Sequence, residues 1–144
     1  MYRRVFFLHV DKKTETPLPA AFEDFDLSCD WNKFSTPKIS RDLIAKEYRS
    51  KTKEYKNSEV FFICNLNVGF VEALNQEVSH NPKQFLPQVK GNPNNRSHTL
   101  ILGNKSDMTD KGMVKIRALL AKGSSWEIFE SSEYKALKQK LSKK

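Results

Sequence analysis

Two histidines and one arginine are the residues of this sequence best suited to acid–base chemistry on a phosphate. His80 stands just before Asn81-Pro82, and Arg96 and His98 follow a loop rich in Asn, Pro and Gly. An imidazole titrates near neutral pH, so one His could accept the 2′-hydroxyl proton of RNA while the other protonates the leaving oxygen. Arg96 would stabilise the phosphate charge. This constellation gives one hypothesis, a metal-independent ribonuclease or related phosphodiester-cleaving enzyme.

The same histidines also have a purely structural interpretation. A histidine at a strand edge commonly hydrogen-bonds a loop carbonyl, and both lie beside the predicted loop. The two interpretations differ in one geometric requirement: catalysis needs the imidazoles of His80 and His98 in one open cleft, close enough to flank a phosphate.

The segment Asn104-Lys105-Ser106-Asp107 follows an apolar strand pattern at 100–103. It resembles the N-K-x-D guanine-reading element of Ras-like GTPases. No GxxxxGK[ST] loop follows the first predicted strand, and no D-x-x-G element stands in the middle, so the phosphate-binding half is missing. The resemblance therefore supports at most a degenerate nucleotide-binding domain. A turn between a strand and a capped helix explains the same residues.

Lysine and arginine are concentrated in two segments. The net charge is +8; residues 31–60 hold eight basic against four acidic side chains, and residues 105–144 hold ten against five. Basic surfaces attract phosphates and acidic proteins. Our leading hypothesis is therefore a small basic binding or accessory protein that engages nucleic acid or an acidic protein partner through Lys/Arg-rich helices. The expected contacts are Arg41, Lys46, Arg49, Lys53, Lys105 and Lys138.

Aromatic residues stand in the segment 30–37, which reads Asp-Trp-Asn-Lys-Phe-Ser-Thr-Pro. We expect Trp31 and Phe34 to anchor the segment in the core, and Ser35 or Thr36 to cap a helix. The alternative is that an aromatic side chain here recognises a ligand.

Metal and cofactor signals are not found in the sequence. Cys29 and Cys64 form no CxxC pair, and His9, His80 and His98 lack the short ligand spacing of zinc motifs, so we expect no metal and no cofactor. Cys64 sits in an apolar run, which favours a buried thiol in a reducing compartment. The apolar run 5–8 is too short for a signal peptide or a membrane span. We expect a cytoplasmic protein without membrane contact.

Hydrophobic patterning predicts a single α/β (or α+β) domain over residues 1–144, with three main helices packed on a four- to five-stranded mixed sheet. Residues 11–35 read as an irregular segment with at most one short strand, and a short helix or turn follows over 67–75. The strands are expected at 3–10, 59–66, 97–103 and 125–129, with a brief one at 77–80, and helices at 40–55, between 107–109 and 123, and from 131 onward.

A longer pattern joins several of these residues: Leu27-Ser28-x-Asp30-Trp31-x-x-Phe34-Ser35, then Leu66-x-Val68-Gly69, Val78-x-His80-x-Pro82 and Arg96-x-His98-x-x-Ile101-x-Gly103. It resembles small uncharacterised bacterial proteins over about residues 27–128. The resemblance implies no activity. It implies only that His80 and His98 belong to a shared site.

Overall fold

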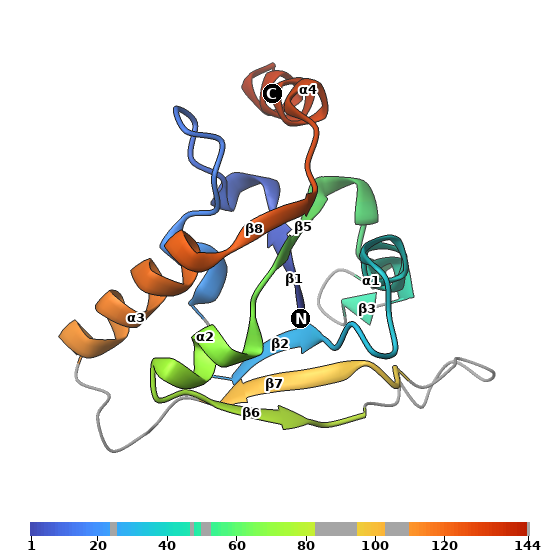
Figure 1. Cartoon of the computed structure of the whole chain (residues 1–144). Coiled ribbons are helices and arrows are strands. Elements are labelled where there is room, and N and C mark those ends of the chain that lie inside the picture. Colours follow the sequence, from blue (N-terminus) through green and yellow to red (C-terminus); the bar gives the residue numbers. More distant parts are fainter. Residues whose placement is uncertain (24–25, 47, 50–52, 83–94, 103–109, 144) are drawn as a thin grey trace.

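The centre of the fold is a six-stranded sheet with the order β6-β7-β2-β1-β5-β8, in which every described pair is antiparallel. The computed structural model (Figure 1) describes residues 1–23, 26–46, 48–49, 53–82, 95–102 and 110–143. A separate two-stranded hairpin is formed by β3 (Tyr48–Arg49) and β4 (Glu54–Tyr55). The strands of the main sheet are β1 (Tyr2–Phe6), β2 (Asp26–Asp30), β5 (Phe61–Asn65), β6 (Glu77–His80), β7 (His98–Leu102) and β8 (Ser125–Ile128).

Two of the described α-helices begin at a side-chain cap. The Thr36 hydroxyl accepts a hydrogen bond from the Ile39 N–H at 3.2 Å, and Asn67 does the same for Phe70 at 3.1 Å, so each satisfies an orphan donor of a first turn. The α-helices are α1 (Pro37–Asp42), α2 (Val68–Ala73), α3 (Asp110–Gly123) and α4 (Ser131–Ser142), and 3-10 turns are η1 (Phe7–His9), η2 (Pro19–Phe22), η3 (Leu43–Lys46) and η4 (Ser58–Val60).

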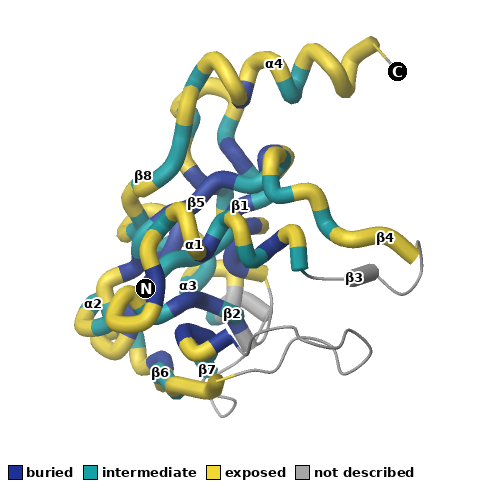
Figure 2. The backbone as a smooth tube through the Cα atoms, turned by 90° about the vertical axis from the view of Figure 1, so that its right-hand side faces the viewer, coloured by how far each residue is buried: buried dark blue, intermediate teal, exposed yellow. Residues whose placement is uncertain are grey.

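The two faces of the sheet have different partners, because neighbouring residues of a strand point to opposite sides. The paired residues Val5 and Phe62 share one face, and they join the main hydrophobic cluster with Val71 of α2 and Leu120 of α3. The other face lies under α1 and η3, where Ile44 is fully buried. Figure 2 shows the buried strands in the middle and α4 projecting from one end with most of its residues exposed.

The join between β1 and β2 is weaker than its neighbours. In the described part of the chain, Tyr2 and Asp30 form the one register pair between these strands, whereas β1 and β5 are paired over all five residues of β1. The Arg3 side chain occupies the join: its Nε donates to the Ala21 carbonyl at 3.0 Å and its Nη1 to the Ser28 carbonyl at 2.9 Å. Side-chain donors therefore replace ladder hydrogen bonds here.

Several sequence expectations are confirmed, and two details of the sheet are wrong. The domain does mix helices with a sheet, and strands lie within the expected segments 59–66 and 97–103. The sheet has six strands instead of four or five, and its described pairs are antiparallel instead of mixed. The additional central strand, β2, lies in the segment 11–35 that we expected to be mostly irregular.

The expected helix over 40–55 is also wrong. Helical structure runs only to Lys46, and Tyr48 then pairs with Tyr55 across the β3–β4 hairpin. Tyrosine favours strands, and the spacing of apolar residues that suggested a helix fits a hairpin equally.

None of the described helices is long and apolar enough to cross a membrane.

Candidate nucleic-acid interface

Three aromatic rings from distant parts of the sequence meet at one edge of the sheet; we call Trp31, Phe34 and His80 the aromatic platform. The Phe34 and His80 rings are stacked, with centroids 5.3 Å apart and planes inclined by 16°. Trp31 meets both edge-on, at 5.4 Å from Phe34 and 5.0 Å from His80. Phe34 is 40% exposed, which departs from the core anchor expected for it, and His80 is exposed as well.

Two cations flank the aromatic platform. The Lys33 Nζ lies 5.4 Å from the centroid of the Trp31 ring and 5.5 Å from that of Phe34. The guanidinium carbon of Arg96 lies 6.0 Å from the Phe34 centroid. These separations are those of cation–π pairs, which hold the positive charges against the rings.

Backbone hydrogen bonds hold the aromatic platform in place. Trp31 follows β2 directly, and its N–H donates to the Ser97 carbonyl at 2.7 Å. The Phe34 N–H donates to the Trp31 carbonyl at 3.0 Å. The His80 Nε2 lies 2.7 Å from the Arg96 carbonyl oxygen, so Nε2 carries the hydrogen and donates.

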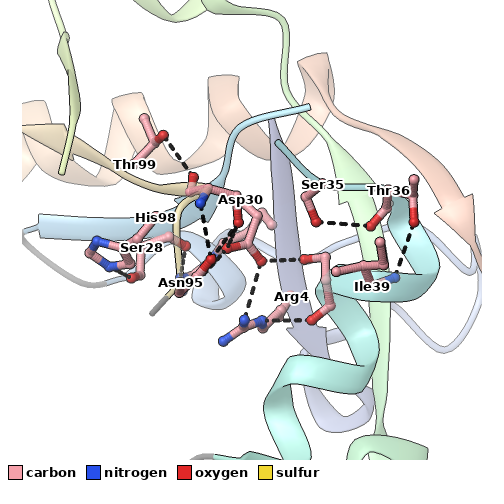
Figure 3. Close-up of polar contacts among 12 residues, drawn as sticks. Arg4, Ser28, Asp30, Ser35, Thr36, Ile39, Asn95, His98 and Thr99 are labelled. Carbon is pink, nitrogen blue, oxygen red and sulfur yellow. Dashed lines mark hydrogen bonds and ion pairs between the residues drawn. The ribbon is translucent and has the colours of Figure 1, made fainter. Parts of the chain in front are cut away.

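A buried carboxylate supports the platform from below. Asp30 is 2% exposed, and its Oδ1 accepts from Asn95 Nδ2 at 2.9 Å and from Ser97 Oγ at 3.0 Å. Its Oδ2 accepts from Arg4 Nη2 at 3.2 Å, as Figure 3 shows. The same oxygen accepts from the Ser40 hydroxyl. The carboxylate thus ties β1, β2, α1 and the turn at 95–97 together, and that turn carries Arg96.

A cavity of about 200 Å³ opens beside Trp31 and His80. Apolar side chains such as Val68 and Val78 line it together with Glu72. Its volume is below the roughly 300–1,000 Å³ of sites that enclose a drug-sized molecule. It suits part of a larger ligand that also rests on the aromatic platform.

The structure does not bring His80 and His98 into one cleft. His80 of β6 pairs with Thr99 of β7, and so its side chain shares a face of the sheet with Thr99. His98 directly precedes Thr99 on β7 and pairs with Asp30 of β2, and so its side chain lies on the other face. The two imidazoles therefore leave the sheet on opposite faces. His98 is 8% exposed, and its Nδ1 lies 2.7 Å from the Asn81 carbonyl oxygen.

Each imidazole thus binds a loop carbonyl, as the structural interpretation requires. The geometry that the two-histidine cleavage hypothesis needs is not present, because the β-strand alternation separates the rings. Arg96 accompanies His80 alone.

The predicted basic contacts do not share one helix. Arg41 of α1 is turned inward, donating to the carbonyls of Ser58 and Glu59 at 3.3 and 3.4 Å and pairing with Glu133 at 3.5 Å. The described part of the structure does not include Lys105, the Arg49 side chain or the motif at 104–107. The others are dispersed: Lys46 ends η3, Lys53 precedes β4 and Lys138 belongs to α4.

Neither cysteine is suited to nucleophilic chemistry. Burial raises the pKa of the Cys29 thiol to about 11 and that of the Cys64 thiol to about 12. Among the described residues, no group of three or more His, Cys, Asp or Glu side chains could hold a metal ion.

Comparison of the chain with protein-family models, with curated proteins and with solved structures gave no match. The candidate site is therefore interpreted from its geometry alone. Sequence reasoning singled out His80 and Arg96 but missed the stacking of Phe34 on His80. Those two residues are distant in sequence, and only the β6–β7 pairing and the turn after β2 bring them together.

Proposed function

We propose that this protein binds single-stranded nucleic acid, with the aromatic platform as the surface on which a base stacks. One observation supports this most directly: Phe34, 40% exposed, lies stacked on His80 and flanked by the charges of Lys33 and Arg96. Exposed aromatic rings next to cations are the combination that single-strand binding sites use, because every base has a π-face and every nucleotide a phosphate.

The exposure of the rings favours recognition over anchoring. A phenylalanine that only anchors its segment gains most by full burial, and ten phenylalanines provide ample core material. The net charge of +8 adds long-range attraction for a polyanion. An acidic protein partner shares the charge complementarity but gives no reason for stacked, exposed rings.

Fluorescence anisotropy with a labelled oligonucleotide of about 16 nucleotides, the upper end of known site sizes, tests the proposal. Phe34→Leu keeps an apolar side chain but removes the π-face. We expect it to weaken binding about tenfold, because stacking contributes roughly 1–3 kcal/mol per base. The matched control is Tyr55→Leu in β4, where the aromatic residue is 49% exposed but distant in sequence from the platform; it should change affinity less than twofold.

Salt titration is the second test of the proposed nucleic-acid binding. Affinity should fall as salt rises, and the double variant Lys33→Gln/Arg96→Gln should reduce the slope of log affinity against log salt by about 1–2, the expected number of lost phosphate contacts. Absence of binding at low salt, or equal affinities of the wild type and Phe34→Leu, would refute the proposal. Binding of an acidic peptide with unchanged affinity in Phe34→Leu would instead favour the protein-partner alternative.

A further inference from the structure

Ser28 and His98 form a close pair on the face of the sheet opposite His80. The Ser28 Oγ lies 2.5 Å from His98 Nε2, and His98 Nδ1 lies 2.7 Å from the Asn81 carbonyl oxygen (Figure 3 shows the Ser28–His98 contact). A carbonyl oxygen can only accept, so Nδ1 carries the ring hydrogen. In the neutral imidazole, Nε2 then presents a lone pair to the serine, and the Ser28 hydroxyl donates to it.

This order of contacts is the arrangement of an activated nucleophile: a hydroxyl, a base within hydrogen-bond distance, and a third group that fixes the tautomer of the base. The base sits on a rigid element, because His98 begins β7 and pairs with Asp30 of β2. A serine and a histidine that only fill a core would satisfy each other in the same way. The surroundings of Ser28 decide between the two interpretations.

Ser28 borders a cavity of about 390 Å³, a volume in the range of small-molecule sites. The hydroxyl of the pair is thus next to space that a substrate could occupy, while His98 behind it is 8% exposed. The charged and titratable side chains that line the cavity are Arg3, Arg4, His9, Glu23 and Lys56.

Three of the side chains that line the cavity are cations, and one of them, Arg4, is paired with the Asp30 carboxylate at 3.2 Å. Arg3 is held directly beside the serine, because its Nη1 donates to the Ser28 carbonyl oxygen at 2.9 Å. A preorganised cation at this place would stabilise negative charge that develops on a substrate oxygen during attack.

We propose that Ser28 is a catalytic nucleophile and His98 its general base, in a site that hydrolyses carboxylic esters. The Ser28 oxygen attacks the ester carbonyl carbon as its proton passes to His98 Nε2. The bond to the leaving oxygen breaks, and His98 returns the proton to the departing alcohol. Water then attacks the acyl-serine, giving its proton to His98; the carboxylic acid leaves, and Ser28 recovers its hydrogen. This proposal is independent of the nucleic-acid site.

A fluorophosphonate probe tests the nucleophile without knowledge of the natural substrate. The Ser28 oxygen should form a bond to phosphorus as fluoride leaves, giving one adduct per chain by intact mass, located on Ser28 by peptide mapping. Ser28→Ala should abolish the adduct. His98→Gln should slow its formation by about 10²-fold or more, the size of a general-base contribution, with an unchanged circular dichroism spectrum. Ser79→Ala is the matched control, since Ser79 lies on the same face of the sheet, and it should label at the wild-type rate.

Hydrolysis of a nitrophenyl ester of a short carboxylic acid tests the reaction. The wild-type protein should hydrolyse this ester faster than buffer does, and Ser28→Ala should reduce the rate to that of buffer. If His98→Gln does not fold, Ser28→Cys replaces it: its thiol should react with iodoacetamide at pH 6, where the buried Cys29 and Cys64 do not. The absence of an adduct on Ser28 in the folded protein, or labelling of His98→Gln at the wild-type rate, would overturn the proposal.

Discussion

At the scale of single residues, Asp30 has the largest structural role of the polar side chains described. Its two oxygens receive four hydrogen bonds, from Arg4, Ser40, Asn95 and Ser97. A buried carboxylate is tolerated only when it is fully paired, and removal of one partner leaves uncompensated polar groups in the interior. Asp30 therefore links stability to the position of the aromatic platform.

Asp30→Ala should lower the free energy of unfolding by about 3–5 kcal/mol, because the buried donors of Ser40, Asn95 and Ser97 would lose their acceptor and Arg4 its ion-pair partner. Urea denaturation followed by circular dichroism measures this loss. Asp42→Ala, at an exposed carboxylate at the end of α1, should change stability by less than about 0.5 kcal/mol. Equal effects of the two substitutions would contradict the assigned role of Asp30.

The residues of the candidate site were predictable only in part. Thr36 caps α1 as its type suggests, and His80 and Arg96 were recognised by their chemistry. The hydrogen bond between Ser28 and His98 was not predicted, since it joins residues of β2 and β7 that are adjacent only in the folded sheet. Nor does a local pattern indicate that Phe34 stays exposed, because exposure depends on which elements cover it.

At the scale of elements, the strands and helices that were predicted correctly are those with a strong local sequence pattern. The continuous apolar run of β5 and the amphipathic spacing of α3 and α4 were sufficient to predict them, since each buries a face determined by its own sequence. The sequence predicted at most one short strand in the segment 11–35 and did not predict that a central strand, β2, lies there, although Leu27-Ser28-Cys29-Asp30 alternates apolar and polar residues. Its polar face is stabilised by tertiary contacts to Arg4 and His98, which no local rule contains.

The close contact between α2 and α3 requires a glycine, which has no Cβ, at position 123. A Cβ on Gly123, the last residue of α3, would lie 2.3 Å from Cε1 of Phe70 in α2. Gly123→Ala should therefore destabilise the protein by about 1–3 kcal/mol, the usual cost of overpacking, although alanine is the better helix former.

A double-mutant cycle in urea separates this clash from other effects of the substitution. In the Phe70→Leu background the shorter side chain leaves room for a methyl group, so Gly123→Ala should cost at least about 1 kcal/mol less than in the wild type. Additive effects of the two substitutions would show that Phe70 is not the obstacle.

At the scale of the whole molecule, the two thiols report on the integrity of the core. Cys29 and Cys64 are 3% and 0% exposed, and burial holds their pKa values well above the usual 9.0. Unfolding lets each thiol ionise at its ordinary pKa, whereas the folded state keeps it neutral. Stability from this source is present below pH 9 and is lost as the pH rises toward 11.

The free energy of unfolding should consequently fall by about 1 kcal/mol per thiol for each pH unit above 9. Urea titrations at pH 8, 9 and 10 measure the slope. The Cys29→Ala/Cys64→Ala variant, less stable at pH 8, should show a flatter dependence, and the difference between the two slopes isolates the thiols from other alkaline titrations. Parallel slopes would mean that both sulfurs meet water in the native state.

The weak join between β1 and β2 divides the sheet into two ribbons, β1-β5-β8 and β2-β7-β6. Along the chain the ribbons are interleaved: β1 belongs to one, β2 to the other, β5 to the first again, β6 and β7 to the second and β8 to the first. Neither ribbon is built from strands that follow one another along the chain. During synthesis, β1 must wait for residues 61–65 before it finds its principal partner, and that ribbon closes only with residues 125–128. The protein should therefore fold late, and after cleavage between β2 and β5 neither piece should retain a complete native ribbon by itself.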